Sequence, residues 1–226
     1  MHSHFSLIWE SVADAVPEHI ALIQGERRIT WRNYEDRAAR LAQGLIDAGL
    51  GHDSKVGMYL YNSPEYAETN FAAMKIGGVP INVNYRYLDE ELHYLLENAD
   101  IEALVFHSSL GDRVARVCDR LPMLKAMICV DDGPAEDGSM GPTNGVPYDI
   151  FLSQASGTAR TQPKGDEIYM LYTGGTTGMP KGVMYPLDSF TDFFMRGFPP
   201  MIGLDPFENA DQFAPAARQM IDTTPP

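Results

Sequence analysis

The stretch Glu167–Pro186, EIYMLYTGGTTGMPKGVMYP, joins an apolar run to a glycine-rich one. The apolar run, Ile168–Tyr172, predicts a buried strand, because β-branched, aromatic and long aliphatic side chains follow one another without a polar break. The next six residues are three glycines and three threonines, which offer little surface for packing. Lys181 follows, between Pro180 and Gly182. The stretch therefore predicts a strand that ends in a functional turn.

The turn has the composition of a phosphate-binding loop. Glycines allow consecutive N–H groups to point to one side and form a nest for an anion, and threonine hydroxyls add hydrogen-bond donors. A lysine supplies a mobile positive charge suited to phosphate oxygens. The residues predicted to hold a polyphosphate are Thr173, Gly174, Gly175, Thr176, Thr177, Gly178 and Lys181.

The spacing excludes two other phosphate loops. A Walker loop requires a lysine preceded by Gly and followed by Ser or Thr, whereas Lys181 lies between Pro180 and Gly182. The dinucleotide fingerprint G-x-G-x-x-G is absent, because Gly174 and Gly175 are adjacent. The remaining alternative is a glycine-rich surface hairpin whose lysine only faces water.

The rest of the chain alternates predicted strands and helices, which indicates an α/β fold with a helix-flanked, mostly parallel sheet. Parallel strands carry ligand sites in the loops after their carboxyl ends, so the phosphate loop is expected at that edge. Segments 131–147 and 155–165 are predicted as surface loops. The other predicted elements are helices over 5–16, 31–48, 63–77, 89–98, 112–121, 148–154 and 187–197, a hairpin over 20–30, and strands over 55–61, 79–83, 103–106, 125–130 and 168–172.

Particular side chains carry further predictions. Thr30 and Ser63 are expected to be helix N-caps. His4, near the chain start, is expected to be solvated rather than to bind a metal. The aromatic rings of the predicted helix over 187–197 are assigned to core packing rather than to a substrate pocket.

Composition argues against nucleic-acid and membrane partners. The net charge of −14, from 31 acidic and 17 basic residues, repels nucleic acid and anionic lipid. No signal peptide and no apolar window of transmembrane length is visible, so a cytoplasmic protein is predicted. Cys118 and Cys129 lack CxxC spacing and are expected to be free thiols.

Tyr172–Val183, YTGGTTGMPKGV, closely resembles the phosphate-loop signature of the adenylate-forming superfamily: acyl-CoA synthetases, luciferases and peptide-synthetase adenylation domains. The resemblance covers roughly residues 5–197, including 18–30 and 59–106, and is greatest to bacterial fatty-acyl and steroid side-chain acyl-CoA synthetases. It implies that ATP and a carboxylic acid form an acyl-adenylate and pyrophosphate, and that coenzyme A then displaces AMP. It also implies that the loop and Lys181 hold the ATP phosphates and that Thr173 supplies an oxygen to Mg²⁺.

The resemblance implies that other family residues have no counterpart in 184–226. These are the adenine-binding tyrosine–glutamate motif, the ribose-binding aspartate, the hinge, the catalytic lysine and the histidine-containing acyl-pocket segment. The expectation is therefore the N-terminal portion of a longer ligase, with 1–197 as part of the AMP-binding domain and 198–226 as an irregular, truncated end. This portion is predicted to be inactive alone.

The residues are also compatible with other functions. One is a non-catalytic nucleotide- or phosphate-binding module that works through a partner, and another is an unstable remnant without activity. Within the superfamily, a peptide-synthetase adenylation domain or a luciferase-like enzyme is the alternative. The residues leave the activated acid and the oligomeric state undetermined.

Overall fold

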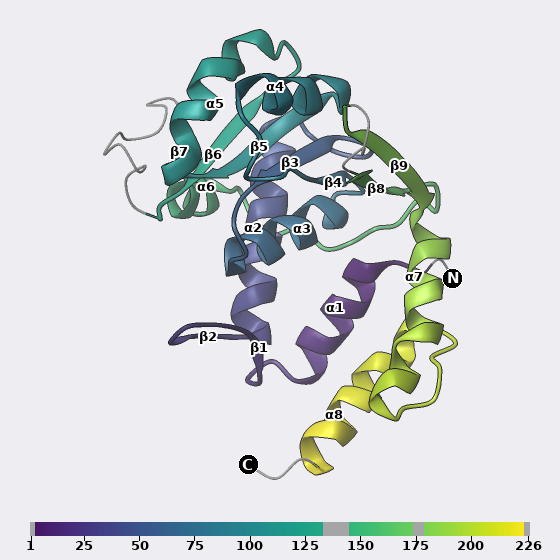
Figure 1. Ribbon diagram of the computed structural model, residues 1–226. Helices are drawn as coiled ribbons and strands as arrows, with labels where there is room; N and C mark the ends of the chain where they lie inside the picture. Colours follow the sequence, from purple (N-terminus) through teal and green to yellow (C-terminus); the bar gives the residue numbers. More distant parts are fainter. Residues whose placement is uncertain (1–2, 133–144, 174–178, 224–226) are drawn as a thin grey trace.

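A five-stranded sheet forms the centre of the computed structural model, which describes residues 3–132, 145–173 and 179–223 (Figure 1). Every neighbouring pair of strands in this sheet is parallel. In spatial order the strands are β4 (Val79–Asn82), β3 (Lys55–Tyr59), β5 (Ile101–His107), β6 (Ala126–Val130) and β7 (Val146–Pro147). The predicted α/β class with a mostly parallel sheet is confirmed. Strand β7 was not predicted, because its two residues lie in the segment expected to be a loop.

Helices cover both faces of the sheet. One face packs against α2 (Trp31–Asp47), α3 (Pro64–Lys75) and α6 (Tyr148–Gln154), and the other against α4 (Asp89–Asn98) and α5 (Gly111–Val117). Side chains of β5 alternate between the two cores: Leu104 and Phe106 enter one, Ala103 and Val105 the other. A parallel sheet is buried on both faces, which explains the unbroken apolar runs of its strands.

The predicted N-caps are confirmed. The Thr30 hydroxyl accepts a hydrogen bond from the Asn33 N–H at 3.2 Å, and the Ser63 hydroxyl accepts one from the Tyr66 N–H at 3.2 Å. Each satisfies an N–H that has no partner within its helix. The helix predicted over 112–121 is shorter than expected, because α5 ends at Val117 and a 3₁₀ turn, Cys118–Arg120, follows it.

The N-terminal part consists of α1 (Phe5–Ala15) and an antiparallel hairpin of β1 (Ile20–Gln24) and β2 (Arg27–Thr30). The prediction that His4 is solvated is wrong, because the residue is only 2% exposed. Its Nδ1 caps α1 by accepting a hydrogen bond from the Ser6 N–H at 3.2 Å. Burial lowers the pKa of the His4 ring, which favours the neutral form that a cap requires.

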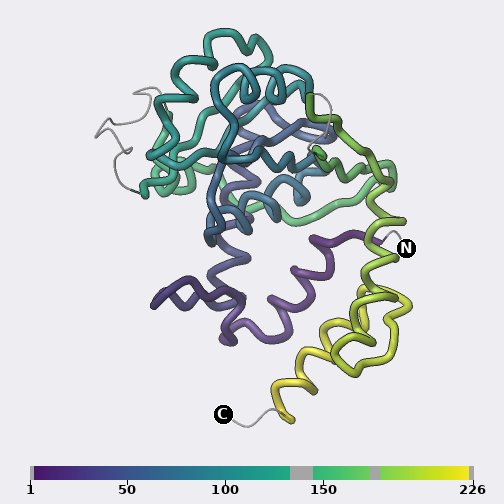
Figure 2. The backbone as a smooth tube through the Cα atoms, in the orientation of Figure 1, coloured from purple at the N-terminus to yellow at the C-terminus, as the bar shows by residue number. Residues whose placement is uncertain are grey.

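The C-terminal segment is more regular than its prolines suggested. Two 3₁₀ turns, Pro199–Ile202 and Ala210–Gln212, lead into α8 (Phe213–Thr223), which lies beside α1 (Figure 2). Pro199 and Pro215 each fall in the first turn of an element, where the missing N–H has no intrahelical acceptor to lose. The irregular end predicted for 198–226 is thus wrong for 213–223. Of the helices described, none combines the length and apolar character needed to cross a bilayer.

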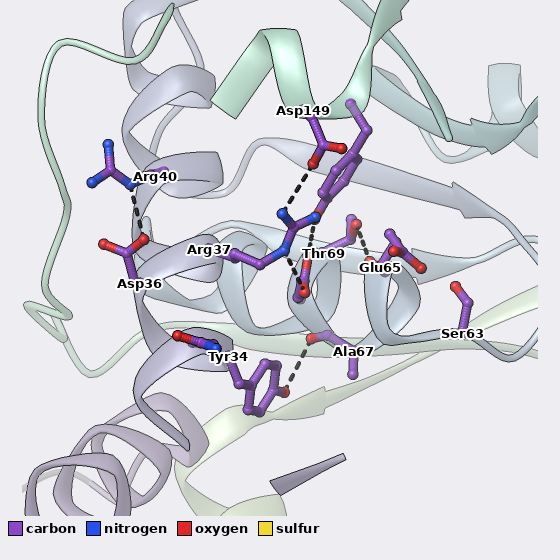
Figure 3. A network of polar contacts seen from close by, with 12 residues as sticks. Tyr34, Asp36, Arg37, Arg40, Ser63, Glu65, Ala67, Thr69 and Asp149 are labelled. Atoms are coloured by element: carbon purple, nitrogen blue, oxygen red, sulfur yellow. Dashed lines mark hydrogen bonds and ion pairs between the residues drawn. The ribbon is translucent and has the colours of Figure 1, made fainter. Parts of the chain in front are cut away.

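Two buried carboxylates are tied to cations between helices. Glu68 of α3 accepts hydrogen bonds from Arg37 of α2 at 2.8 Å and from the Tyr148 hydroxyl of α6 at 2.8 Å. Figure 3 shows the Arg37 side chain, which also binds Asp149. Lys75, at the end of α3, is paired with Glu10 of α1 at 2.5 Å and with a carboxylate of α2. Both groups join segments that are far apart in the sequence.

Candidate phosphate-binding site

Strands β8 (Ile168–Thr173) and β9 (Lys181–Pro186) form an antiparallel hairpin. The prediction that the phosphate loop follows a strand of the parallel sheet is therefore wrong, because the strand before the loop, β8, pairs antiparallel with β9. The connection is only seven residues long, whereas a parallel return needs a crossover of a dozen or more. The predicted burial is also wrong, since within β8 only Met170 is buried. Met170 joins the core between the sheet and α4, which anchors the hairpin.

Thr173 and Lys181 lie opposite each other at the mouth of this hairpin. Directly opposite residues of an antiparallel pair place their side chains on the same face. Both residues are exposed, and neither side chain forms a hydrogen bond or ion pair with another described residue. The other predicted site residues, Gly174, Gly175, Thr176, Thr177 and Gly178, lie outside the described residues.

Glu167, which sequence reasoning did not single out, secures the base of the hairpin. Its carboxylate accepts hydrogen bonds from the Lys164 N–H at 2.5 Å and the Gly165 N–H at 2.8 Å. Its carbonyl accepts a hydrogen bond from the Leu187 N–H, the first residue of α7 (Leu187–Gly197), at 2.8 Å. Burial raises the pKa of Glu167, but the backbone donors outweigh it and the pKa falls below its usual value. An ionised side chain thus fixes the start of β8.

The hairpin is also attached to α4 and α7. The Tyr172 hydroxyl donates a hydrogen bond to Asn98 Oδ1 at 2.9 Å. The Phe190 ring of α7 stacks on Tyr169 at 4.8 Å and on Tyr185 at 5.2 Å between ring centroids. The assignment of Phe190 to packing is therefore confirmed. These contacts hold the two strands of the hairpin against α4 and α7.

A second polar cluster lies at the carboxyl edge of the parallel sheet. The Asp132 carboxylate accepts hydrogen bonds from the Ser108 hydroxyl at 2.9 Å and the Ser109 N–H at 2.8 Å. His107 Nδ1 accepts one from the Tyr61 N–H at 3.0 Å, and the two rings stack. Burial lowers the pKa of His107, although the charge of Asp132 opposes this. The signal available in the sequence was that these residues lie at or just after the carboxyl ends of strands.

This cluster lies where the chain changes direction across the sheet. Strand β4 follows β3 on one side, and β5 then pairs with the other side of β3. Open α/β sheets bind ligands outside the carboxyl ends of strands at such a switch point. The cluster and the hairpin mouth are therefore two polar regions of the fold, of which the sequence pointed only to the second.

An apolar cavity of about 370 Å³ lies between α1, α7 and α8. The described residues that line it are all apolar, and they include Trp9, Phe194, Phe207, Phe213 and Met220. Phe194, predicted to serve core packing, lines this cavity, while Phe193 is 66% exposed. The described residues that line the cavity carry no charged, hydroxyl or amide side chain that could orient a reacting ligand.

The chain belongs to the AMP-binding enzyme family, which matches residues 9–214. The resemblance carried by the phosphate-loop signature is thereby confirmed. The chain is 41% identical over 177 residues to a 3-oxocholest-4-en-26-oate–CoA ligase of Rhodococcus rhodochrous, covering 78% of this chain and 32% of that relative. It is 38% identical over 205 residues to a medium-chain acyl-CoA ligase of Mycobacterium avium, covering 84% and 36%.

The fold is likewise that of adenylate-forming ligases. The crystal structure of an anthranilate–CoA ligase in complex with anthranoyl-AMP matches with a TM-score of 0.75 at 20% identity, over 88% of this chain and 37% of that one. The chain spans about one third of the length of the curated relatives it matches.

Proposed function

We propose that this chain is the N-terminal part of an ATP-dependent carboxylic acid–CoA ligase and that the β8–β9 turn holds the ATP phosphates. One observation carries the site assignment: Thr173 and Lys181 face each other, exposed, at the mouth of one hairpin. The turn between them contains three glycines and two threonines. Backbone N–H groups of such a turn, two hydroxyl-bearing side chains and one ammonium group can surround a polyphosphate.

The chemistry of the reaction explains the need for these groups. A carboxylate oxygen attacks the α-phosphorus, and negative charge builds up on the departing pyrophosphate. Preorganised donors and a lysine directed at the β- and γ-phosphate oxygens stabilise that charge. The exposed Thr173 hydroxyl fits a Mg²⁺ ligand, because hard oxygen donors suit this ion and no described side chain occupies it. When bound, Mg²⁺ supplies further positive charge to the phosphates.

The proposed acid is a fatty or steroid side-chain acid, since two relatives are named as ligases of such acids. We further propose that residues 1–226 bind phosphate without completing the reaction, because 184–226 contains no match to the family's adenine-binding motif or catalytic lysine. Pyrophosphate exchange by the natural gene product, with medium-chain, long-chain and steroid acids compared, tests the substrate class. Exchange by residues 1–226 alone would contradict the second proposal.

Lys181→Ala is expected to weaken binding of Mg²⁺–ATP and of inorganic triphosphate to this chain about tenfold, because one charge-assisted contact to a phosphate oxygen is lost. Isothermal titration calorimetry measures both affinities. The matched control is Lys164→Ala, which removes another exposed lysine from the segment before β8. Equal affinities for Lys181→Ala and the unchanged chain would refute the site. Thr173→Val is expected to lower only the gain in ATP affinity that Mg²⁺ provides. Thr173→Ser, which keeps the hydroxyl, is expected to preserve that gain.

A further inference from the structure

Three connecting segments meet at the edge of the parallel sheet opposite its carboxyl ends. His52 lies between α2 and β3, Gly77 lies between α3 and β4, and Asp166 and Glu167 directly precede β8. One donor atom from each of His52, Asp166 and Glu167 lies within 4.8 Å of the other two. This group has no part in the proposed phosphate site, and it combines one imidazole with two carboxylates.

The His52 ring has one partnered nitrogen and one unpartnered nitrogen. Its Nε2 lies 3.1 Å from Asp166 Oδ1. Its Nδ1 is buried and forms no hydrogen bond with any residue in the described part of the chain. When Nε2 carries the proton and donates to Asp166, Nδ1 presents a lone pair. A carboxylate bound to the distal nitrogen in this way is typical of metal-ligating histidines, where it fixes the tautomer and the ring orientation.

The unpartnered nitrogen lies close to Gly77, which has no side chain. A Cβ atom built on Gly77 would lie 3.0 Å from His52 Nδ1 and 3.8 Å from Glu167 Oε1. Gly77 has a φ of 68°, in the left-handed region that favours glycine. The backbone conformation therefore explains why this position has no side chain. An imidazole nitrogen and a carboxylate oxygen therefore border the same small volume.

Glu167 is held in place for such a contact. The residue is 6% exposed, and two backbone N–H groups bind its carboxylate oxygens, which leaves a further lone pair on Oε1. These bonds keep the carboxylate ionised and restrict its rotation. The donor is therefore anionic and preorganised, whereas a mobile surface carboxylate would have to be ordered first.

We propose that His52 Nδ1 and Glu167 Oε1 bind one divalent transition-metal ion, with Zn²⁺ the best match, and that Asp166 positions the His52 ring. A nitrogen–oxygen donor pair suits Zn²⁺, while Ca²⁺ and Mg²⁺ prefer oxygen donors alone. Water completes the coordination. Both donor atoms lie beside the Cβ position that Gly77 lacks, and binding would bring them closer together around the ion. The ion would tie the base of the β8–β9 hairpin to the parallel sheet.

The test is Zn²⁺ titration of the untagged chain against a chromophoric chelator. About one equivalent is expected to bind, His52→Ala and Glu167→Gln should each lower the affinity at least about tenfold, and Asp166→Asn about tenfold. Glu167→Gln keeps a carbonyl oxygen for one of the two backbone donors. His19→Ala, at an exposed histidine, and His2→Ala, at the chain start, are matched controls expected to change the affinity less than about twofold.

A second readout separates binding from misfolding. Zn²⁺ should raise the thermal unfolding midpoint of the unchanged chain and of His19→Ala, because it binds the folded state, and should not raise that of His52→Ala. Failure to bind Zn²⁺, or unchanged affinity in His52→Ala, would overturn the proposal. Loss of binding in His2→Ala alone would also overturn it, by locating the ion at the chain start.

Discussion

Lys75→Met is expected to lower the free energy of unfolding by about 3 kcal/mol at neutral pH, because it removes the cation from a buried ionic cluster. The Lys75 side chain is 0% exposed. Its Nζ donates hydrogen bonds to Glu10 Oε1 at 2.5 Å and Glu35 Oε1 at 2.8 Å, joining α3 to α1 and α2. Methionine fills a similar volume but leaves two carboxylates without this partner, and a buried uncompensated charge is costly.

The effect of Lys75→Met should depend on pH. Burial raises the pKa of Glu10, but the hydrogen bond and charge of Lys75, with hydrogen bonds from Thr161, outweigh it and hold the pKa below 4.5. A depressed pKa in the folded state contributes stability above the ordinary value, and this contribution is lost as the pH falls through the folded-state value. The difference between the two proteins should therefore shrink below about pH 4.5.

Urea unfolding between about pH 3 and pH 8, followed by circular dichroism, measures both effects. Arg160→Met is the matched control, because Arg160 contacts Glu35 at 3.1 Å in the same cluster but has a side chain that is 49% exposed. Exposed ion pairs contribute little, so this variant should lose no more than about 1 kcal/mol. Equal losses in the two variants would show that the cluster does not behave as a buried one.

Arg37→Leu is expected to destabilise the protein by about 3 kcal/mol at pH 8, because it removes the cation that faces Glu68. Arg37 donates to Glu68 Oε1 at 2.8 Å and to Asp149 Oδ1 at 2.9 Å, and Figure 3 shows it reaching from α2 toward Asp149. The Glu68 side chain is 0% exposed. Without Arg37, the Tyr148 hydroxyl still donates a hydrogen bond to this buried carboxylate, but no described cation pairs with it there.

The pH dependence should have the opposite sign to that of Lys75→Met. Burial raises the pKa of Glu68 above 4.5, although Arg37 and Tyr148 oppose the rise. A raised folded-state pKa contributes stability that is full below the ordinary value and is lost as the pH rises through the folded-state value. Removing Arg37 raises that pKa further, so the destabilisation should grow between about pH 5 and pH 8.

The same urea experiment measures the Arg37→Leu effect, with Arg40→Leu as control. Arg40 is also in α2, but among the described residues it forms an ion pair with Asp36 alone, one turn away, and both side chains are about half exposed. That variant should lose less than about 0.5 kcal/mol at every pH. A loss for Arg37→Leu that stays constant with pH would contradict the role assigned to Glu68.

Local sequence patterns were sufficient to predict most helices and strands and part of the candidate phosphate-binding site. The unbroken apolar runs predicted a parallel sheet, and Thr30 and Ser63 predicted helix starts, because a strand's burial and a helix cap depend on residues close in sequence. The glycine–threonine turn also placed Thr173 and Lys181 at one loop, where the structure has them. These features depend on interactions across a few residues.

Contacts between distant segments were beyond the reach of such patterns. Whether β8 joins the parallel sheet or pairs with β9 depends on where the short turn returns the chain. The residues of β8 alone predict a strand in both cases and do not indicate its partner. His4 is buried because it caps α1, and α8 is a helix beside α1 despite prolines in the segment that precedes and begins it.

The sequence by itself thus determined the class of fold, the helix starts and the composition of the phosphate turn, because propensity, capping and periodicity act locally. Only the tertiary structure decided the pairing of β8, the partners of Glu68 and Lys75, and the meeting of His52 with Glu167 over Gly77. The partners of Glu68 and Lys75, and the pair His52 and Glu167, are between 31 and 115 positions apart in the sequence, and packing of whole elements brings them together.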